Sequence, residues 1–126
     1  MGVFERTVRV SGPLPNVWAD VHAVIDTGSD HCQFPRDVLE EVGATFGFKA
    51  WVLLPNAREV QADIYNITLH FDEYILNTTA DAGPNHGPAL IGSVALSQMG
   101  LGVDPKGERL IPHVLHLLSE TRWPTV

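Results

Sequence analysis

The sequence predicts one mainly β, barrel-like domain with one or two short helices. Short apolar or alternating segments are separated by turns that draw on 9 Pro and 11 Gly among the 126 residues. Two segments fit short helices, and strands do not alternate with long helices as they do in βαβ units. The composition, 44% hydrophobic and 18% charged, is ordinary for a globular chain of one domain.

The first half of the chain predicts four strands and one helix. We expect strands at 3–10 and 18–25 with a Pro-rich turn at 12–16 between them, and the second strand is apolar on both faces near its end. Residues 35–43 fit a short helix with Pro at its start, acids in its first turns and Gly at its end. A strand at 46–54 then leads through a hairpin tip at 55–58 into a long strand at 59–71. Its apolar positions change phase near residues 64 and 65, which predicts a β-bulge or a change of packing partner.

The second half predicts shorter elements. We expect strands at 74–80, 89–92, 101–104 and 109–111, with a loop at 83–88. Ser93 is expected to cap a small helix at 94–99, which Gly100 closes. We assign residues 1–112 to the domain and residues 113–126 to a C-terminal tail whose leucines pack on a partner subunit.

Charge, cysteine content and terminal sequence limit the classes of partner, cofactor and cellular location that we expect. A formal net charge of −7 argues against nucleic acid and against an anionic membrane surface. Cys32 is the single cysteine, so no disulfide can form within the chain, and no apolar run is long enough to cross a bilayer. The N-terminal residues lack the pattern of a signal peptide, and we therefore expect a cytoplasmic protein. No metal-ligand spacing is present, so neither a metal nor another cofactor is expected.

The segment with most chemical content is Asp26-Thr27-Gly28-Ser29. Val24 and Ile25 place Asp26 at the end of a buried strand, Gly28 permits a sharp turn, and Thr27 adds a hydroxyl beside the carboxylate. Taken alone, the triplet favours an aspartate that caps a turn or the start of a helix.

A second segment changes that balance. Residues 89–92 (Ala-Leu-Ile-Gly), a short helix, and residues 100–104 (Gly-Leu-Gly-Val-Asp) follow Asp26 at a spacing that resembles the retropepsin-like aspartic proteases, closest to the small single-lobed bacterial type. Phe34-Pro35 followed by a short helix is also similar to that family. The resemblance covers roughly residues 21–112, and it implies a retropepsin-like acid-protease barrel and an aspartic endopeptidase.

The resemblance also implies a homodimer. Catalysis needs two neighbouring carboxylates that share one proton, which is the established behaviour of aspartic proteases. No other aspartate stands in an Asp-Thr-Gly or Asp-Ser-Gly setting; these are Asp20, Asp30, Asp37, Asp63, Asp72, Asp81 and Asp104. The partner carboxylate is then Asp26 of a second copy, related by a two-fold axis. The substrate is an extended peptide or protein.

The resemblance assigns further roles around the catalytic Asp26. Thr27, Gly28 and Ser29 support the catalytic loop. Ser29 stands where many relatives have Ala, and our own hypothesis is that its hydroxyl donates a hydrogen bond that favours the ionised carboxylate. A flap formed by the hairpin at 53–59 closes over the peptide. The substrate-binding residues implied are Gly28, Asp30, Leu54, Pro55, Asn56 and Ala57.

Two departures from the family pattern keep an alternative open. The flap tip has Pro55-Asn56-Ala57-Arg58 where Gly is usual, and Ser93-Val94 follow Gly92 where many relatives carry Arg or Asp. A non-catalytic peptide-binding or structural module that keeps the acid-protease fold fits these departures.

Overall fold

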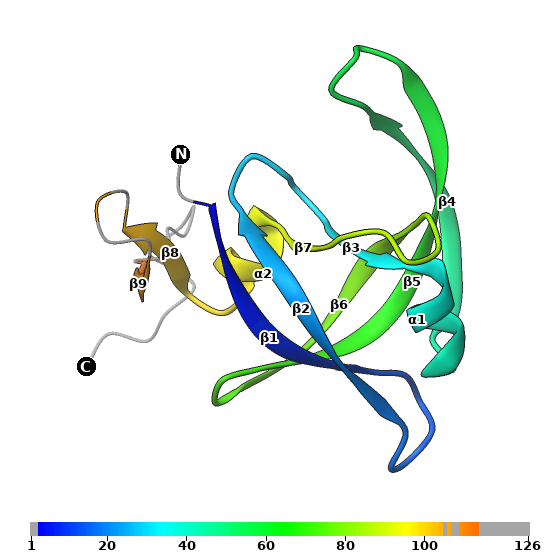
Figure 1. The fold of residues 1–126 in the computed structure, drawn as a ribbon, viewed down its shortest axis with the longest axis horizontal. Coiled ribbons are helices and arrows are strands. Elements are labelled where there is room, and N and C mark those ends of the chain that lie inside the picture. Colours follow the sequence, from blue (N-terminus) through cyan, green and yellow to red (C-terminus); the bar gives the residue numbers. More distant parts are fainter. Residues whose placement is uncertain (1–2, 105, 107–108, 114–126) are drawn as a thin grey trace, which may run out of the picture.

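The computed structural model describes residues 3–104, 106 and 109–113, and its described part is mainly β with two short helices (Figure 1). The mainly β prediction is therefore confirmed. In chain order the elements are β1 (Val3–Ser11), β2 (Trp18–Asp26), β3 (Cys32–Pro35), α1 (Arg36–Glu41), β4 (Thr45–Leu53), β5 (Glu59–Phe71), β6 (Tyr74–Gly83), β7 (Ala89–Ile91), α2 (Ser93–Gln98), β8 (Leu101–Asp104) and β9 (Arg109–Pro112).

The main sheet closes into a barrel. Its strand order is β1-β2-β7-β3-β6-β5-β4, and β1 also pairs with β5, so that six strands form a ring from which β4 extends. Closure leaves few free edges, which protects such a small sheet from edge-to-edge pairing. β8 and β9 form a separate antiparallel hairpin at one side of the barrel (Figure 1).

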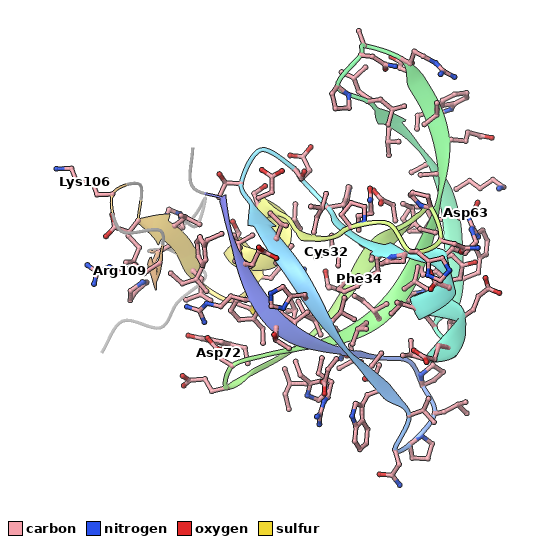
Figure 2. The ribbon with its side chains drawn as sticks, in the orientation of Figure 1. Cys32, Phe34, Asp63, Asp72, Lys106 and Arg109 are labelled. Atoms are coloured by element: carbon pink, nitrogen blue, oxygen red, sulfur yellow. The ribbon has the colours of Figure 1, made fainter. Side chains whose placement is uncertain are left out.

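The core fills the inside of this ring. Ile25, Phe34, Leu69 and Ile91 are fully buried and come from four different strands of the barrel. Figure 2 shows Cys32 and Phe34 inside the ring, and both side chains are buried. Because side chains alternate along a strand, the neighbouring positions on β2, β3 and β7 face away from this core.

The predicted change of phase in the long strand is confirmed. Ile67 and Leu69 of β5 face the core, whereas Ile64 is buried on the opposite face of the strand. The register of the β4–β5 pair shifts between Phe46 and Phe48, directly across from this point. The irregularity thus lies on β4, where one extra residue lets β5 change the face that it buries.

Both helices are short and end at glycines in the left-handed region. Gly43 (φ +67°) follows α1 and Gly100 (φ +69°) follows α2, as the sequence predicts. The expected cap of α2 is wrong in detail. Gly92 is the N-cap residue, and Ser93 is the first helical residue, whose backbone N–H donates to a carbonyl outside the helix.

The remaining differences concern strand ends. β3 was not expected as a strand, and β6 runs to Gly83 rather than ending at residue 80. The two strands pair in parallel, from Cys32 opposite Ala80 to Pro35 opposite Gly83. This pairing makes residues 32–35 a strand and continues β6 beyond residue 80. No helix among the described residues has the length and hydropathy needed to cross a bilayer. The predicted packing of residues 114–126 lies outside the described residues.

Candidate active site

Asp26 is the last residue of β2, beside the central parallel pair of the barrel. β2 and β7 pair in parallel, with Ile25 opposite Ile91, and both isoleucine side chains are fully buried. The strand therefore holds the backbone of Asp26 in place, while its side chain is half-buried at the rim. The loop that follows rises at the same end of the molecule as α2 (Figure 1).

The carboxylate of Asp26 accepts hydrogen bonds from its own loop. The backbone N–H of Gly28 donates to Oδ1 at 2.9 Å, and the Ser29 hydroxyl lies at 3.5 Å from Oδ2. The Ser29 backbone N–H also donates to the Asp26 carbonyl at 3.2 Å. These bonds fix the orientation of the carboxylate, and Thr27 and Gly28 remain exposed beside it.

Gly92 holds the other side of this loop. A Cβ atom at Gly92 would lie 2.5, 2.6 and 2.7 Å from the backbone oxygens of His31, Asp30 and Ser29. Two of these oxygens accept hydrogen bonds from the start of α2, Ser93 N–H to Ser29 O at 2.8 Å and Val94 N–H to Asp30 O at 3.0 Å. The importance that the sequence gives to the 89–92 segment thus has a steric reason, since only glycine lets the loop and the helix approach so closely.

The predicted loop residues are brought together, and the predicted flap residues lie elsewhere. Residues 26–30 form one continuous loop, whereas Leu54, Pro55, Asn56 and Ala57 form the tip of an arm made by β4 and β5. Figure 1 shows this arm rising from the barrel toward the same end of the view as the β2–β3 loop. The side chain of Asp30 has no hydrogen bond or ion pair to any described residue and stays exposed.

The arm tip is a tight turn with an unusual residue. Leu54 N–H donates to Arg58 O at 2.8 Å, and Ala57 N–H donates to Leu54 O at 3.0 Å. The Asn56 side chain accepts from the Arg58 N–H at 3.1 Å. Ala57 has φ +65°, a conformation that glycine or asparagine normally takes in a three-residue hairpin. The tip keeps the hairpin geometry and stores strain at Ala57.

A charged cluster that sequence patterns did not indicate ties the arm to the barrel. Asp63 on β5 accepts from Lys49 Nζ on β4 at 2.6 Å and from Arg36 on α1 at 3.0 Å, and Arg36 also donates to the Tyr65 hydroxyl at 3.3 Å. Hydrogen bonds from Lys49 and then Arg36 lower the pKa of Asp63. Figure 2 shows Asp63 near the base of the arm. The three charged residues of this cluster come from α1, β4 and β5, so no local pattern in the sequence brings them together.

Two more ionisable groups, Cys32 and Asp81, lie near the loop, and the sequence pattern assigned a role to neither. Burial raises the pKa of the Cys32 thiol to about 11, which keeps it protonated and unsuited to act as a nucleophile at neutral pH. Asp81 on β6 is half-buried, and this burial raises its pKa, partly opposed by nearby His31.

The smaller of two hollows in the described part of the chain lies next to the Asp26 loop. A space of about 160 Å³ borders Thr27, α2, β8 and His113, and a larger one of about 440 Å³ lies between the 12–13 turn, β5, β6 and α2. Neither is lined by Asp26. Within the described part of the chain, no three His, Cys, Asp or Glu residues cluster as metal ligands would.

Comparison with known proteins agrees with this architecture. EIAV protease complexed with the inhibitor HBY-793 has a similar structure, with a TM-score of 0.57 and 14% identity over 77% of this chain and 88% of that one. A retropepsin-like aspartic protease from Rickettsia conorii has a TM-score of 0.51 and 12% identity over 81% of this chain and 87% of that one. No protein-family model and no curated protein matches the sequence. At these identities the comparison shows the fold, which is retropepsin-like as predicted.

Proposed function

We propose that this chain, which has the retropepsin-like fold, is one half of a homodimeric aspartic endopeptidase that hydrolyses peptide bonds between two Asp26 carboxylates. The observation that carries the proposal is the setting of Asp26. It ends a buried strand of this fold, faces away from the core, and its carboxylate is oriented by Gly28 and Ser29 at the exposed rim.

The chemistry follows from bringing two such carboxylates together. At hydrogen-bond distance they cannot both ionise, so they share one proton. The ionised carboxylate takes a proton from a water molecule, which attacks the peptide carbonyl, while the protonated carboxyl donates to the carbonyl oxygen. As the C–N bond breaks, the leaving amine takes the proton that the first carboxylate received from the water, and the collapsing intermediate returns a proton to the second carboxylate. No metal or other cofactor enters these steps.

The second carboxylate has to come from a second copy. The chain contains a single Asp-Thr-Gly, and the exposed Thr27 and Gly28 lie where a partner loop can approach along a two-fold axis. Thr27 also borders the hollow beside α2 and β8, which an element of the partner can fill. We further propose that residues 1–112 form the domain and that the 113–126 tail packs on the partner.

The arm supplies the cover for the peptide. Its β4 strand carries large apolar side chains that remain exposed in the single chain, Phe48 (53%), Trp51 (69%) and Leu53 (69%). Such a concentration of apolar surface on a projecting arm suits a lid that closes on a substrate and a partner subunit. Leu54, Pro55, Asn56 and Ala57 at its tip, together with Gly28 and Asp30 in the loop, would contact the peptide backbone.

Cleavage of an unfolded protein substrate tests the proposal. We expect cleavage by the wild type that an aspartic-protease inhibitor blocks, and none by Asp26→Asn, which should still fold and dimerise. Asp72→Asn is the matched control, since it makes the same charge change at an exposed hairpin tip and should cleave like the wild type. Undiminished cleavage by Asp26→Asn would contradict the assigned role.

Mixing the two proteins tests the shared site. Adding an equal amount of Asp26→Asn to a fixed amount of wild type should lower the activity to about half once subunits have exchanged, because only dimers with two intact carboxylates are active. A monomeric enzyme with a complete site would keep its full activity in the mixture.

The departures at the arm tip and after Gly92 favour a second candidate, a peptide-binding module without activity. The exposed Asp30 side chain lacks a partner among the described residues, and the arm tip is strained at Ala57. Such a module would bind extended peptides yet leave them intact at every pH from acidic to neutral. Inhibitor-sensitive cleavage by the wild type excludes it.

A further inference from the structure

Asp81 is a half-buried acid on β6. Its carboxylate has no hydrogen bond and no ion pair to any residue that the structure describes, and its only favourable electrostatic neighbour is His31. Burial raises the pKa of Asp81, which means that its ionised form destabilises the folded chain.

Two other aspartates of the barrel have cations beside them. Asp63 lies against Lys49 and Arg36, and Asp20 lies against Arg9 at 2.9 Å. These pairs lie on exposed or partly exposed surfaces, where a counter-ion is least needed. Asp81 is half-buried and has no ion pair to any Lys or Arg that the structure describes, and an energetically unfavourable group of this kind is characteristic of a ligand site.

The register places Asp81 on the same face of the sheet as Asp26. Gln33 of β3 pairs with Leu90 of β7 on one side and with Asp81 of β6 on the other, and Leu90 pairs with Val24 of β2. These residues are half-buried, whereas the intervening positions on each strand point into the core. Asp26 lies two residues beyond Val24 and shares its face.

This row fixes how far Asp81 lies from the catalytic candidate. Three strand spacings separate Val24 from Asp81 and amount to about 14 Å, and Asp26 lies about 7 Å further along β2; the curvature of the barrel shortens the direct distance. An extended peptide advances about 3.3 Å per residue, so a side chain two to four residues from the scissile bond would reach Asp81. The buried Ile64, which pairs with Asp81 across β5 and β6, forms an apolar wall on the far side.

On the basis of the proposed endopeptidase function, we propose that Asp81, with His31 and Gln33 beside it, forms a specificity subsite for a Lys or Arg side chain of the substrate. A cationic head group would pair with the carboxylate, and its aliphatic stem would lie along Leu90 and Ile64. The Gln33 amide borders the same position and can orient the head group through its carbonyl oxygen.

Matched peptides test the subsite. A cleavable peptide is varied at each of the four positions on either side of the scissile bond, with Lys, Arg, Gln and Glu in turn. The wild type should favour Lys or Arg over Gln at one position by about tenfold in kcat/KM, since a charge-assisted pair in a half-buried site exceeds a neutral one by that order. Asp81→Asn should reduce this preference to about twofold and leave the other positions unchanged.

Two further variants separate a subsite from a general charge effect. Asp72→Asn removes the same charge at the distant β5–β6 hairpin tip and should keep the wild-type preference (Figure 2). Asp81→Lys should favour Glu over Lys at the same position. An unchanged preference in folded Asp81→Asn, or an equal loss in Asp72→Asn, would overturn the inference while the protease proposal stands.

Binding distinguishes failure of the inference from failure of the proposed function. The Lys, Gln and Glu peptides are titrated against Asp26→Asn and the double variant Asp26→Asn with Asp81→Asn. A preference for Lys in the first protein that is lost in the second supports the subsite even if the wild type cleaves none of the peptides, in which case the protease proposal alone is wrong. Equal affinity for the Lys and Gln peptides in both proteins would overturn the subsite.

Discussion

Gly92 lies where three backbone carbonyl oxygens converge, and Gly92→Ala perturbs the Asp26 loop without touching its side chains. The backbone of Gly92 has φ −92°, which any residue adopts, so the effect of alanine is steric. The new Cβ would lie 2.5 Å from the His31 oxygen, and ordinary contact begins at 3.4 Å, so the loop and the helix must separate by about 0.9 Å.

That separation has a calculable cost. The Ser93–Ser29 hydrogen bond, now 2.8 Å, would exceed hydrogen-bond range, and the Val94–Asp30 bond at 3.0 Å would follow. Losing both removes about 2 kcal/mol, and the crowding adds about 1–3 kcal/mol. We therefore expect Gly92→Ala to lower the free energy of unfolding by about 3–5 kcal/mol.

Denaturant unfolding measures the stability of Gly92→Ala, and kcat/KM for peptide cleavage is sensitive to a displacement of Asp26. A loop shifted by about 1 Å should lower kcat/KM by about 100-fold in the fraction that remains folded. Gly102→Ala is the matched control, because its Cβ would meet nothing closer than His113 Cβ at 3.5 Å, and it should stay within about 0.5 kcal/mol of the wild type. If Gly92→Ala behaves like Gly102→Ala in both assays, the proposed steric contact does not hold the loop.

Three further variants have defined outcomes. Ala57→Gly should raise the free energy of unfolding by about 1 kcal/mol in thermal melting, because glycine adopts the left-handed backbone at φ +65° without strain. The control Ala62→Gly in β5 should lower the free energy of unfolding by about 0.5–1 kcal/mol. A loss of stability in Ala57→Gly would refute the strain. Burial raises the pKa of Asp81 in the folded chain, so the free energy of unfolding of the wild type falls as the pH rises from the pKa of Asp81 in the unfolded chain, near 4, through its pKa in the folded chain. Asp81→Asn should therefore be the more stable protein at pH 7, and the difference should shrink toward pH 4. A difference that stays constant in melting experiments across this pH range would argue against the effect of burial. Ser29→Ala should lower kcat/KM by about fivefold and leave the free energy of unfolding nearly unchanged, because the hydroxyl at 3.5 Å from Oδ2 helps to orient the Asp26 carboxylate. An unchanged kcat/KM would remove this role.

The long strands could be predicted because their pattern is local. The alternation along 59–71 and its change of phase are visible in the sequence, and the structure places the compensating irregularity at Phe46–Phe48 on the neighbouring strand. β3 lacks such a pattern. It is a four-residue strand that is apolar at Cys32, Phe34 and Pro35 and runs directly into a helix, so nothing in the sequence separates it from the loop before it.

The candidate site divides in the same way. Asp26 to Asp30 are contiguous, so the sequence itself brings them together. Asp81 and His31 are fifty positions apart, and they become neighbours only because β3 and β6 pair in parallel, with Gln33 opposite Asp81. A parallel pairing between distant segments depends on the whole barrel, and no local property of either segment predicts it.

Substitutions of residues that hold the loop and substitutions of the proposed catalytic and substrate-binding residues therefore report on different properties of the protein. Gly92 and the start of α2 position residues 29–31 through backbone contacts, and those contacts are the same whether the chain cleaves peptides or only binds them. A loss of peptide binding or of cleavage in Gly92→Ala would therefore report on the position of the loop and would not by itself identify a catalytic residue. Asp26 and Asp81 contribute little to packing, since both side chains are only half-buried at the rim. Their substitution leaves the barrel intact, so cleavage lost at Asp26 and substrate preference lost at Asp81 bear directly on catalysis and on recognition.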